Sequence, residues 1–299
     1  MPDRPIPAFV NPDSGSGAAA LEALQATGRF SVETCPPASL RDRLRDRIER
    51  AVTSGAERIV VAGGDGTIAQ AAAAVVATRA ALAVVPGGTL NHFARNHGIP
   101  SDPAEAAAVA ASGEVVTADV GYVNGRLFLN TSSFGAYVAF VRTRERLERR
   151  LGYRVATVVA ALRLLGRVRP FTAELELDGV ARRFRSSLVF VGVGERELQL
   201  PALGSPAEHG RRGLHVIVVR GGTWARLVAV GLTAAFGGNR AITRGSLAET
   251  FVVDRCRIEM PRPEGRVAVD GEIVTMRSPL EYRIARDALK LVVPRKTGE

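Results

Sequence analysis

The segment Gly63-Gly64-Asp65-Gly66-Thr67 carries the strongest chemical signal in this sequence. It follows an apolar run and precedes an alanine-rich stretch, so it is expected to join a strand to a helix. Glycines there let backbone N–H groups approach an anion, and the helix N-terminus adds its dipole. Asp65 would repel a phosphate unless a divalent cation lay between them, which indicates a metal–nucleotide site. Taken alone, the segment fits equally well a tight turn capped by an aspartate.

Two further polar turns that contain glycine follow apolar runs, namely Asn11-Pro12-Asp13-Ser14-Gly15 and Pro86-Gly87-Gly88-Thr89-Leu90-Asn91. Parallel sheets bind ligands at the carboxyl ends of their strands, so the three turns can converge on one ligand. The sequence contains no GxxxxGK[ST] pattern, which excludes a P-loop protein. It also has no well-formed GxGxxG after the first strand, which argues against an ordinary dinucleotide dehydrogenase.

A fourth polar turn, Asp270-Gly271-Glu272, lies far along the chain. By itself it predicts only a hairpin. Together with Asp65, it can supply a carboxylate base opposite a phosphate donor. Phosphoryl transfer to an alcohol needs positioning, charge neutralisation and a group that accepts the hydroxyl proton. A two-lobed protein with nucleotide loops on one lobe and a carboxylate turn on the other has that layout.

The elements that must position these turns alternate in the first third of the chain. Arg58–Ala62 and Ala80–Val85 are typical of buried strands, whereas Arg41–Val52 and Ile68–Thr78 are typical of helices. Strands that alternate with helices predict a parallel sheet covered by helices on both faces.

From about Asp119 onward, the pattern changes. Asn124-Gly125, Asp178-Gly179 and Asp270-Gly271 each separate two strand-like runs, which predicts hairpins and a mostly antiparallel β half. We expect helices in this half at Arg142–Leu165 and Trp224–Phe236.

The composition bounds the class of protein. The chain has 299 residues, of which 46% are hydrophobic and 23% charged, so it can bury a core. Its two cysteines allow neither a disulfide framework nor a zinc site, and it shows neither a signal peptide nor a run of about 18 apolar residues. A cytoplasmic protein is therefore expected. The net charge of +10 fits either a genomic bias toward arginine or attraction to a polyanion or an anionic membrane.

The motifs NPxSG, GGDGT, PGGTxNxFAR and a late DGE, in this order, resemble the diacylglycerol kinase catalytic family of bacterial lipid kinases and sphingosine kinases. The resemblance extends from Asn11 to Pro294. GGDGT alone is shared with NAD kinases, whereas Thr89–Arg95 and Asp270–Glu272 favour the lipid branch.

The resemblance implies an α/β nucleotide-binding domain and a mostly antiparallel β-sandwich domain, with the active site in the cleft between them. The expected boundaries are residues 1–122, with 287–299 returning, for the first domain and 123–286 for the second. Glu272, with Asp270 as second choice, would accept the proton, and Asp65 would help to hold magnesium. The residues expected to contact ATP are Asn11, Ser14, Gly15, Thr34, Gly63, Gly64, Asp65, Gly66, Thr67, Thr89 and Asn91.

Three departures from the family pattern stand out. His92 occupies a position where many relatives have aspartate. His209–His215 replaces an aspartate-rich stretch that binds a structural magnesium in some relatives, and Arg and His are poor ligands for that ion, so we expect no structural magnesium. Gly192-Val193-Gly194 stands where relatives often have asparagines.

The function expected from the sequence is an ATP- and magnesium-dependent kinase that phosphorylates a hydroxyl of diacylglycerol or a related lipid, in phospholipid metabolism. Its expected partners are the lipid and the anionic inner face of the membrane, which Arg142–Arg150 and Leu151–Leu165 could contact; no nucleic acid is expected. One alternative is an NAD kinase-like enzyme that acts on a soluble hydroxyl compound, and another is a non-catalytic nucleotide-binding regulator. The sequence names neither the lipid nor the oligomeric state.

Overall fold

The computed structural model describes residues 4–35, 40–164, 170–197, 206–207, 209–220 and 248–295. The chain forms two compact units. Unit 1 comprises Met1–Val120 and Ala285–Glu299, and unit 2 comprises Gly121–Ile284. The last strand of unit 1 therefore comes from a part of the chain that follows the whole of unit 2.

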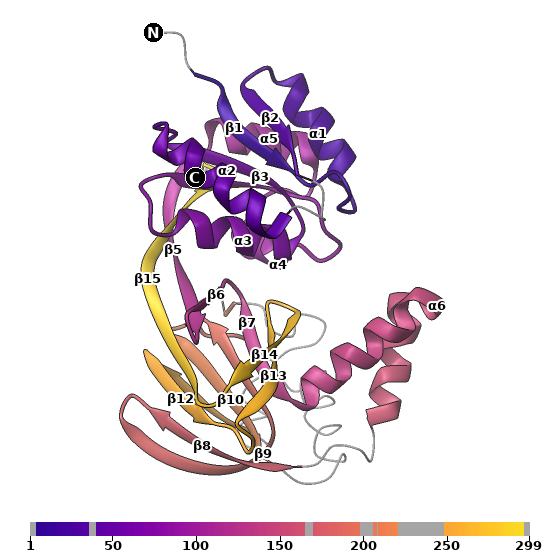
Figure 1. Ribbon diagram of the computed structural model, residues 1–299, viewed down its shortest axis with the longest axis vertical. Coiled ribbons are helices and arrows are strands. Elements are labelled where there is room, and N and C mark those ends of the chain that lie inside the picture. Colours follow the sequence, from indigo (N-terminus) through magenta and orange to yellow (C-terminus); the bar gives the residue numbers. More distant parts are fainter. Residues whose placement is uncertain are drawn as a thin grey trace. The chain divides into compact units, whose positions relative to one another are not determined.

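Unit 1 is built on a parallel sheet whose strands lie in the order β4-β3-β1-β2. Figure 1 labels β1, β2 and β3 among the helices of this unit. The strands are β1 (Ile6–Val10), β2 (Phe30–Thr34), β3 (Arg58–Gly63) and β4 (Ala81–Pro86). Every residue of β4 is buried, and β3 is buried from its second residue onward. Near-continuous apolar strands of this kind are typical of a parallel sheet covered on both faces.

Helices alternate with these strands, as the sequence predicts. They are α1 (Gly17–Ala26), α2 (Leu40–Thr53), α3 (Asp65–Val75), α4 (His92–Asn96) and α5 (Pro103–Ser112). Helix α1 contacts α5, and α2 contacts α3. On the highly charged α2, Leu44 and Ile48 are buried at four-residue spacing, so its charges form the solvated face. The predicted α/β architecture is confirmed.

Unit 2 is mostly antiparallel, which is also confirmed. Its strands follow the order β14-β13-β7-β9-β8-β12-β15, and β10 pairs with β9 and β11. Two long strands, β5 (Glu114–Val123) and β15 (Leu280–Val293), belong by sequence to both units, and β15 pairs with β4 at Leu291. The other strands are β6 (Arg126–Phe128), β7 (Thr131–Gly135), β8 (Phe171–Leu177), β9 (Val180–Val193), β10 (Leu214–Arg220), β11 (Ala248–Val253), β12 (Arg255–Glu259), β13 (Glu264–Val269) and β14 (Glu272–Arg277).

The three predicted hairpins are present, each with a two-residue turn. The first turn residues, Asn124, Asp178 and Asp270, all have φ of 46°, and the glycines that follow also have positive φ. This backbone matches the right-handed twist of the flanking strands, and asparagine, aspartate and glycine tolerate it best. The hairpins thereby hold alternating side chains of β8, β12, β13 and their neighbours in one buried core.

The helix that the sequence places at Arg142–Leu165 is α6 (Ala136–Leu164), which begins earlier and bends at Gly152 (φ 70°, ψ 163°). No helix in the described part of the chain has the length and apolar character needed to cross a bilayer. The predicted helix Trp224–Phe236 lies outside the described residues.

Candidate functional site

Three loops follow the carboxyl ends of adjacent strands in unit 1. The first loop (residues 11–16) follows β1, and the third (87–91) follows β4. The second (63–67) runs from the last residue of β3 into the first turn of α3. Because β4, β3 and β1 are neighbours in a parallel sheet, the three loops emerge at the same edge. The structure therefore brings together the three glycine-containing turns that the sequence singles out.

Backbone contacts join the three loops. Gly87 donates its N–H to the carbonyl of Gly63 at 2.8 Å, and Ser16 donates its N–H to the carbonyl of Gly87 at 3.0 Å. A Cβ on Gly88 would lie 2.8 Å from the Cα of Gly64, so a larger residue could not occupy this position without separating the loops. The second and third loops therefore pack backbone against backbone.

Asp65 holds the third loop in place. Its two carboxylate oxygens accept the N–H groups of His92 and Phe93, each at 3.2 Å, at the start of α4. The capping role that the sequence leaves open is therefore real, although Asp65 caps the neighbouring helix α4 and lies in the first turn of its own helix, α3. Each carboxylate oxygen keeps a further lone pair for a metal ion.

Several predicted ligand residues use their polar atoms to shape the loops. The Asn91 side chain accepts the N–H of Gly88 and donates to its carbonyl, both at 2.8 Å. Ser14 donates its hydroxyl to the carbonyl of Asn11 at 2.8 Å, and the Asn11 amide oxygen accepts the N–H of Asp13 at 3.2 Å. Thr67 is 8% exposed and packs against Gly63. These residues build the loops as well as being candidates to contact a ligand.

Four of the remaining predicted contacts are open to solvent. Gly15, Thr34 and Thr89 are exposed, and Thr34 ends β2 beside Val10. Gly66 is exposed too, and a Cβ built on it would meet no atom within 4 Å. At the start of α3, Gly64 is the N-cap and supplies no side chain to bind the first N–H groups of the helix. These donors are available to an anion that approaches over Gly66.

The donor set of unit 1 fits a magnesium ion that arrives with a nucleotide. Magnesium is commonly held by one or two carboxylates together with substrate phosphates and water. Within the described ranges, no three His, Cys, Asp or Glu side chains gather in a way that could hold a metal by themselves. Asp65 beside an open helix N-terminus therefore suits a shared ion, with phosphates as its other ligands.

In unit 2, Asp270 is committed to the backbone. Its carboxylate accepts three N–H groups, from Leu129 at 2.7 Å, Asn130 at 2.8 Å and Thr131 at 2.9 Å. Its own N–H donates to the carbonyl of Thr131 at 2.8 Å. These bonds fasten the turn between β13 and β14 to the segment that precedes β7.

Glu272 follows in the same turn and is more available. Its side chain is 36% exposed and makes an ion pair with Arg126 at 2.6 Å. Arg126 begins the strand after the Asn124-Gly125 turn, and no motif in the sequence marks it as a site residue. The guanidinium orients the Glu272 carboxylate without burying it. Of the two acidic residues, Glu272 is therefore better placed to accept a proton.

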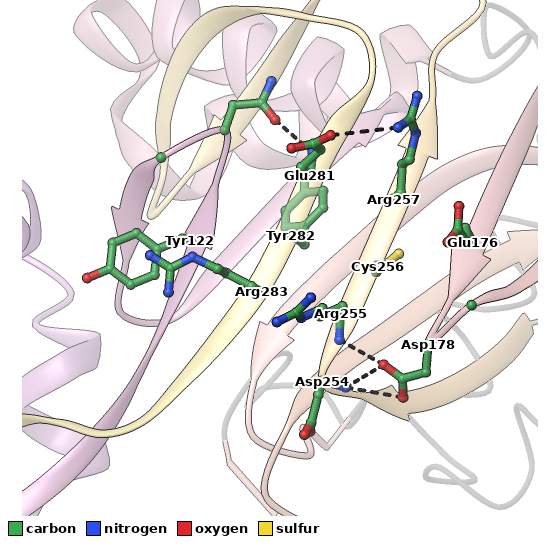
Figure 2. Close-up of a pocket in the computed structure, with 13 residues that line it drawn as sticks. Tyr122, Glu176, Asp178, Asp254, Arg255, Cys256, Arg257, Glu281, Tyr282 and Arg283 are labelled. Atoms are coloured by element: carbon green, nitrogen blue, oxygen red, sulfur yellow. Dashed lines mark hydrogen bonds and ion pairs between the residues drawn. The ribbon is translucent and has the colours of Figure 1, made fainter.

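A separate groove of about 930 Å³ lies within unit 2, on the outer face of β12 and β15 (Figure 2). Charged side chains of both signs line it, and the Arg283 guanidinium stacks on the Tyr122 ring at 3.9 Å from its centroid. None of the predicted site residues borders it. Its charged lining does not suit an acyl chain, so it is not the apolar pocket that a lipid substrate requires.

Comparison with known proteins identifies the region that holds the three loops. Residues 5–123 match the family model for the diacylglycerol kinase catalytic domain. This part of the chain is similar to members of the diacylglycerol kinase catalytic family. The resemblance noted in the sequence is confirmed, and the matched region contains the first, second and third loops.

Curated relatives of this family agree over parts of their length. The chain is 43% identical over 109 residues to a Pseudomonas aeruginosa protein named "Probable lipid kinase YegS-like", with 35% of each chain covered. It is 30% identical over 183 residues to a Mycobacterium tuberculosis protein named "Diacylglycerol kinase", with 58% of this chain and 59% of the relative covered. The chain thus matches between about a third and three-fifths of the length of these relatives.

The fold agreement extends further. A crystal structure of a diacylglycerol kinase from Bacillus anthracis matches with a TM-score of 0.70 over 100% of both chains, at 20% sequence identity. At this identity the match concerns the fold alone. It shows that unit 2, like the diacylglycerol kinase catalytic region in unit 1, has an architecture found in that solved structure.

Proposed function

We propose that this protein is an ATP- and magnesium-dependent kinase that phosphorylates a hydroxyl group of diacylglycerol or a related lipid. The observation that carries the proposal is the convergence of the three loops at one edge of the unit 1 sheet, within the diacylglycerol kinase catalytic region. Unit 1 would bind the nucleotide, and unit 2 would bind the lipid and supply the base. In this proposal the phosphate donor belongs to unit 1, and the acceptor and its base belong to unit 2.

Each candidate residue has a definable task in this reaction. The N–H groups at the start of α3 would bind phosphate oxygens, and Asp65 would hold magnesium against them. Magnesium, when bound there, would neutralise negative charge on the phosphates. Glu272 would accept the proton of the lipid hydroxyl, while Arg126 keeps its carboxylate oriented. Asp270 would fix the turn that carries Glu272.

The proposal predicts which acceptor is phosphorylated. When the protein is incubated with γ-labelled ATP, magnesium and a panel of lipid extracts, label should move into a lipid that carries a free hydroxyl. Diacylglycerol is the first candidate, and chelation of magnesium should abolish the transfer. Thin-layer separation of the labelled lipids gives the measurement. Transfer of label to NAD instead would support the soluble-acceptor alternative, and ATP binding without transfer to any acceptor would support a regulator.

We also propose that α6 brings the enzyme to an anionic membrane, at the inner face of the cytoplasmic membrane. Arg146 and Arg150 are exposed on this helix. Leu151 is 43% exposed and Val155 is 52% exposed, so the same helix also presents apolar side chains. A cation near an anionic bilayer gains roughly 1 kcal/mol, and this gain fades within about 8 Å at physiological salt. Several arginines and an apolar surface together would give reversible binding.

Removing these groups should weaken vesicle binding. The variant Arg146→Gln with Arg150→Gln should bind vesicles of acidic lipids less well and lose activity on them, because the electrostatic gain is lost. Leu151→Ser with Val155→Ser should remove the part of binding that resists high salt. Vesicle co-sedimentation at low and high salt measures both effects.

Matched controls lie in unit 2. Arg277→Gln removes a cation whose side chain is 85% exposed, and Val180→Ser removes an apolar side chain that is 56% exposed, so neither should alter vesicle binding. Activity on a short-chain, water-soluble lipid analogue should persist in every α6 variant. Unchanged co-sedimentation of both α6 variants would exclude this helix as the membrane contact and leave the kinase proposal standing.

A further inference from the structure

Arg196 is a buried cation in unit 2 that the reaction outlined above does not use. It follows the end of β9 and is only 3% exposed. An isolated antiparallel β-bridge pairs its backbone with that of Pro206. A charged group in such a place carries a large desolvation penalty unless its surroundings compensate for it. Its surroundings therefore indicate what it does.

Gly192 makes room for the Arg196 side chain. A Cβ built on Gly192 would lie 2.6 Å from Cγ and 3.2 Å from Nε of Arg196. The arginine stem therefore passes directly over the backbone of Gly192, and any larger residue there would displace it. The departure from the family pattern at Gly192 acquires a physical reason, because the missing side chain leaves space for a cation.

The register of the sheet shows where this cation lies. His215 of β10 is paired with Gly192 of β9, and Gly192 is paired with Thr131 of β7. The next residue in the row is Asp270, whose N–H donates to the carbonyl of Thr131. Arg196 thus lies over a row of residues that ends at the acidic turn.

His215 fixes the backbone of Arg196 at the other end of this row. Its Nδ1 accepts the N–H of Arg196 at 2.9 Å. Burial lowers the pKa of His215 to about 4, so its ring is neutral at physiological pH and Nδ1 remains an acceptor. The backbone of Arg196 is therefore anchored independently of its guanidinium.

Asp270 compensates for the buried charge. Burial lowers the pKa of Arg196 to about 10, and the nearby Asp270 carboxylate opposes this shift. Arg196 remains protonated near neutral pH, since its pKa stays well above 7. The attraction is reciprocal, so the guanidinium also favours the ionised form of Asp270. In that form Asp270 accepts the three N–H groups that fasten the turn.

We propose that Arg196 is a positioning residue of the catalytic turn: over Gly192, its buried guanidinium holds Asp270 as a carboxylate, and Asp270 holds the turn that presents Glu272. This inference rests on the proposed function, in which Glu272 is the base. The competing explanation is that Arg196 only fills the space over Gly192. The two explanations differ in whether the charge of Arg196 matters and in whether its effect depends on Asp270.

Four variants separate charge from volume. Arg196→Met keeps an unbranched apolar stem but removes the charge, and kcat on the lipid should fall roughly ten-fold, as expected for coupled residues of one charge network. Arg196→Lys should retain most of the activity. Gly192→Ala should displace the arginine and lower kcat in the same direction. Arg185→Met, on an exposed position of β9, is the matched control and should leave kcat unchanged. The KM for ATP should not change in any of them.

The pH dependence of kcat provides a second test, because it would not change if Arg196 only filled the space over Gly192. A neighbouring cation lowers the pKa of a carboxyl group, so its removal raises that pKa. In Arg196→Met, the loss of kcat at acid pH should therefore begin at a higher pH than in the unmodified protein. An unchanged acid limb would overturn the electrostatic role.

A double-mutant cycle with Asp270→Asn completes the test. If Arg196 acts through Asp270, Arg196→Met should add little further loss of kcat or thermal stability in the Asp270→Asn background. Additive losses, or a lysine variant as impaired as the methionine variant, would overturn the inference. The double-mutant cycle of thermal stabilities measures the Arg196–Asp270 coupling without any assay of activity. Full turnover in Glu272→Gln would instead refute the proposed base, whatever the double-mutant cycle of thermal stabilities shows.

Discussion

Replacing Glu272 by glutamine is expected to lower turnover on the lipid substrate by about 10²–10⁴-fold, the usual contribution of a positioned base. Glutamine keeps the size of the side chain but cannot accept the hydroxyl proton. Nucleotide binding should stay nearly intact, because the three loops that would bind it belong to unit 1. Steady-state kinetics on the lipid, combined with calorimetric titration of ATP, would separate the two effects.

The control is Glu264→Gln on β13, an exposed glutamate paired with Arg277. It should leave turnover unchanged. If Glu272→Gln also turned over at a near-normal rate, the proton would have to go to Asp270 or to water. Asp270 is a poor substitute, since its carboxylate already accepts three backbone N–H groups.

Replacing Gly66 by valine is expected to weaken ATP binding by about 100-fold or more. The side chain would stand over the N-terminus of α3, where we propose that a phosphate approaches. Two hydrogen bonds to a charged group are worth roughly 1.5–3 kcal/mol each, and their joint loss corresponds to this factor. The fold should tolerate the change, since a Cβ on Gly66 meets no atom within 4 Å. Calorimetric titration and thermal melting without ligand give the two measurements.

Ala104→Val provides a matched control, because Ala104 is the second residue of α5, as Gly66 is of α3. It should change neither ATP affinity nor melting temperature appreciably. Gly64→Val is a less clean probe. A Cβ on Gly64 would already lie 3.4 Å from the Cα of Gly88, so a valine would also press on the third loop. Normal ATP affinity in Gly66→Val would mean that the second loop is only a turn.

The strands, helices and hairpins could be predicted from the sequence because each depends on residues that are close together in the chain. Apolar runs that end at polar turns containing glycine predict the strands before the loops, and the four-residue spacing of Leu44 and Ile48 predicts α2. The aspartate–glycine and asparagine–glycine pairs predict the hairpins, because few other residues accept positive φ. The start of α6 at Ala136 was missed, although Gly135, with φ of 96°, stands directly before it, because the charged run from Arg142 onward was the stronger helix signal.

The hydrogen bonds and ion pairs of the candidate site could not be predicted from the sequence, because they depend on contacts between segments far apart in the chain. The motif around Asp65 indicates a polar loop, but not that its carboxylate binds the start of α4. The Asp270-Gly271-Glu272 turn offers two acids, and only the family resemblance ranks Glu272 ahead of Asp270 as the proton acceptor. Tertiary register makes them different, binding Asp270 to the backbone of residues 129–131 and pairing Glu272 with Arg126.

Strand β15 has a consequence for synthesis of the chain on the ribosome. The sheet of unit 1 includes Leu291 beside Leu82 of β4, and Leu289, Leu291 and Val292 are buried there. These residues are translated only after all of unit 2. At about 5–20 residues per second, unit 1 must wait roughly ten seconds or more with the β4 edge of its sheet unfilled. An exposed, apolar edge is prone to aggregation, so nascent chains of this protein are expected to depend on chaperones until β15 emerges.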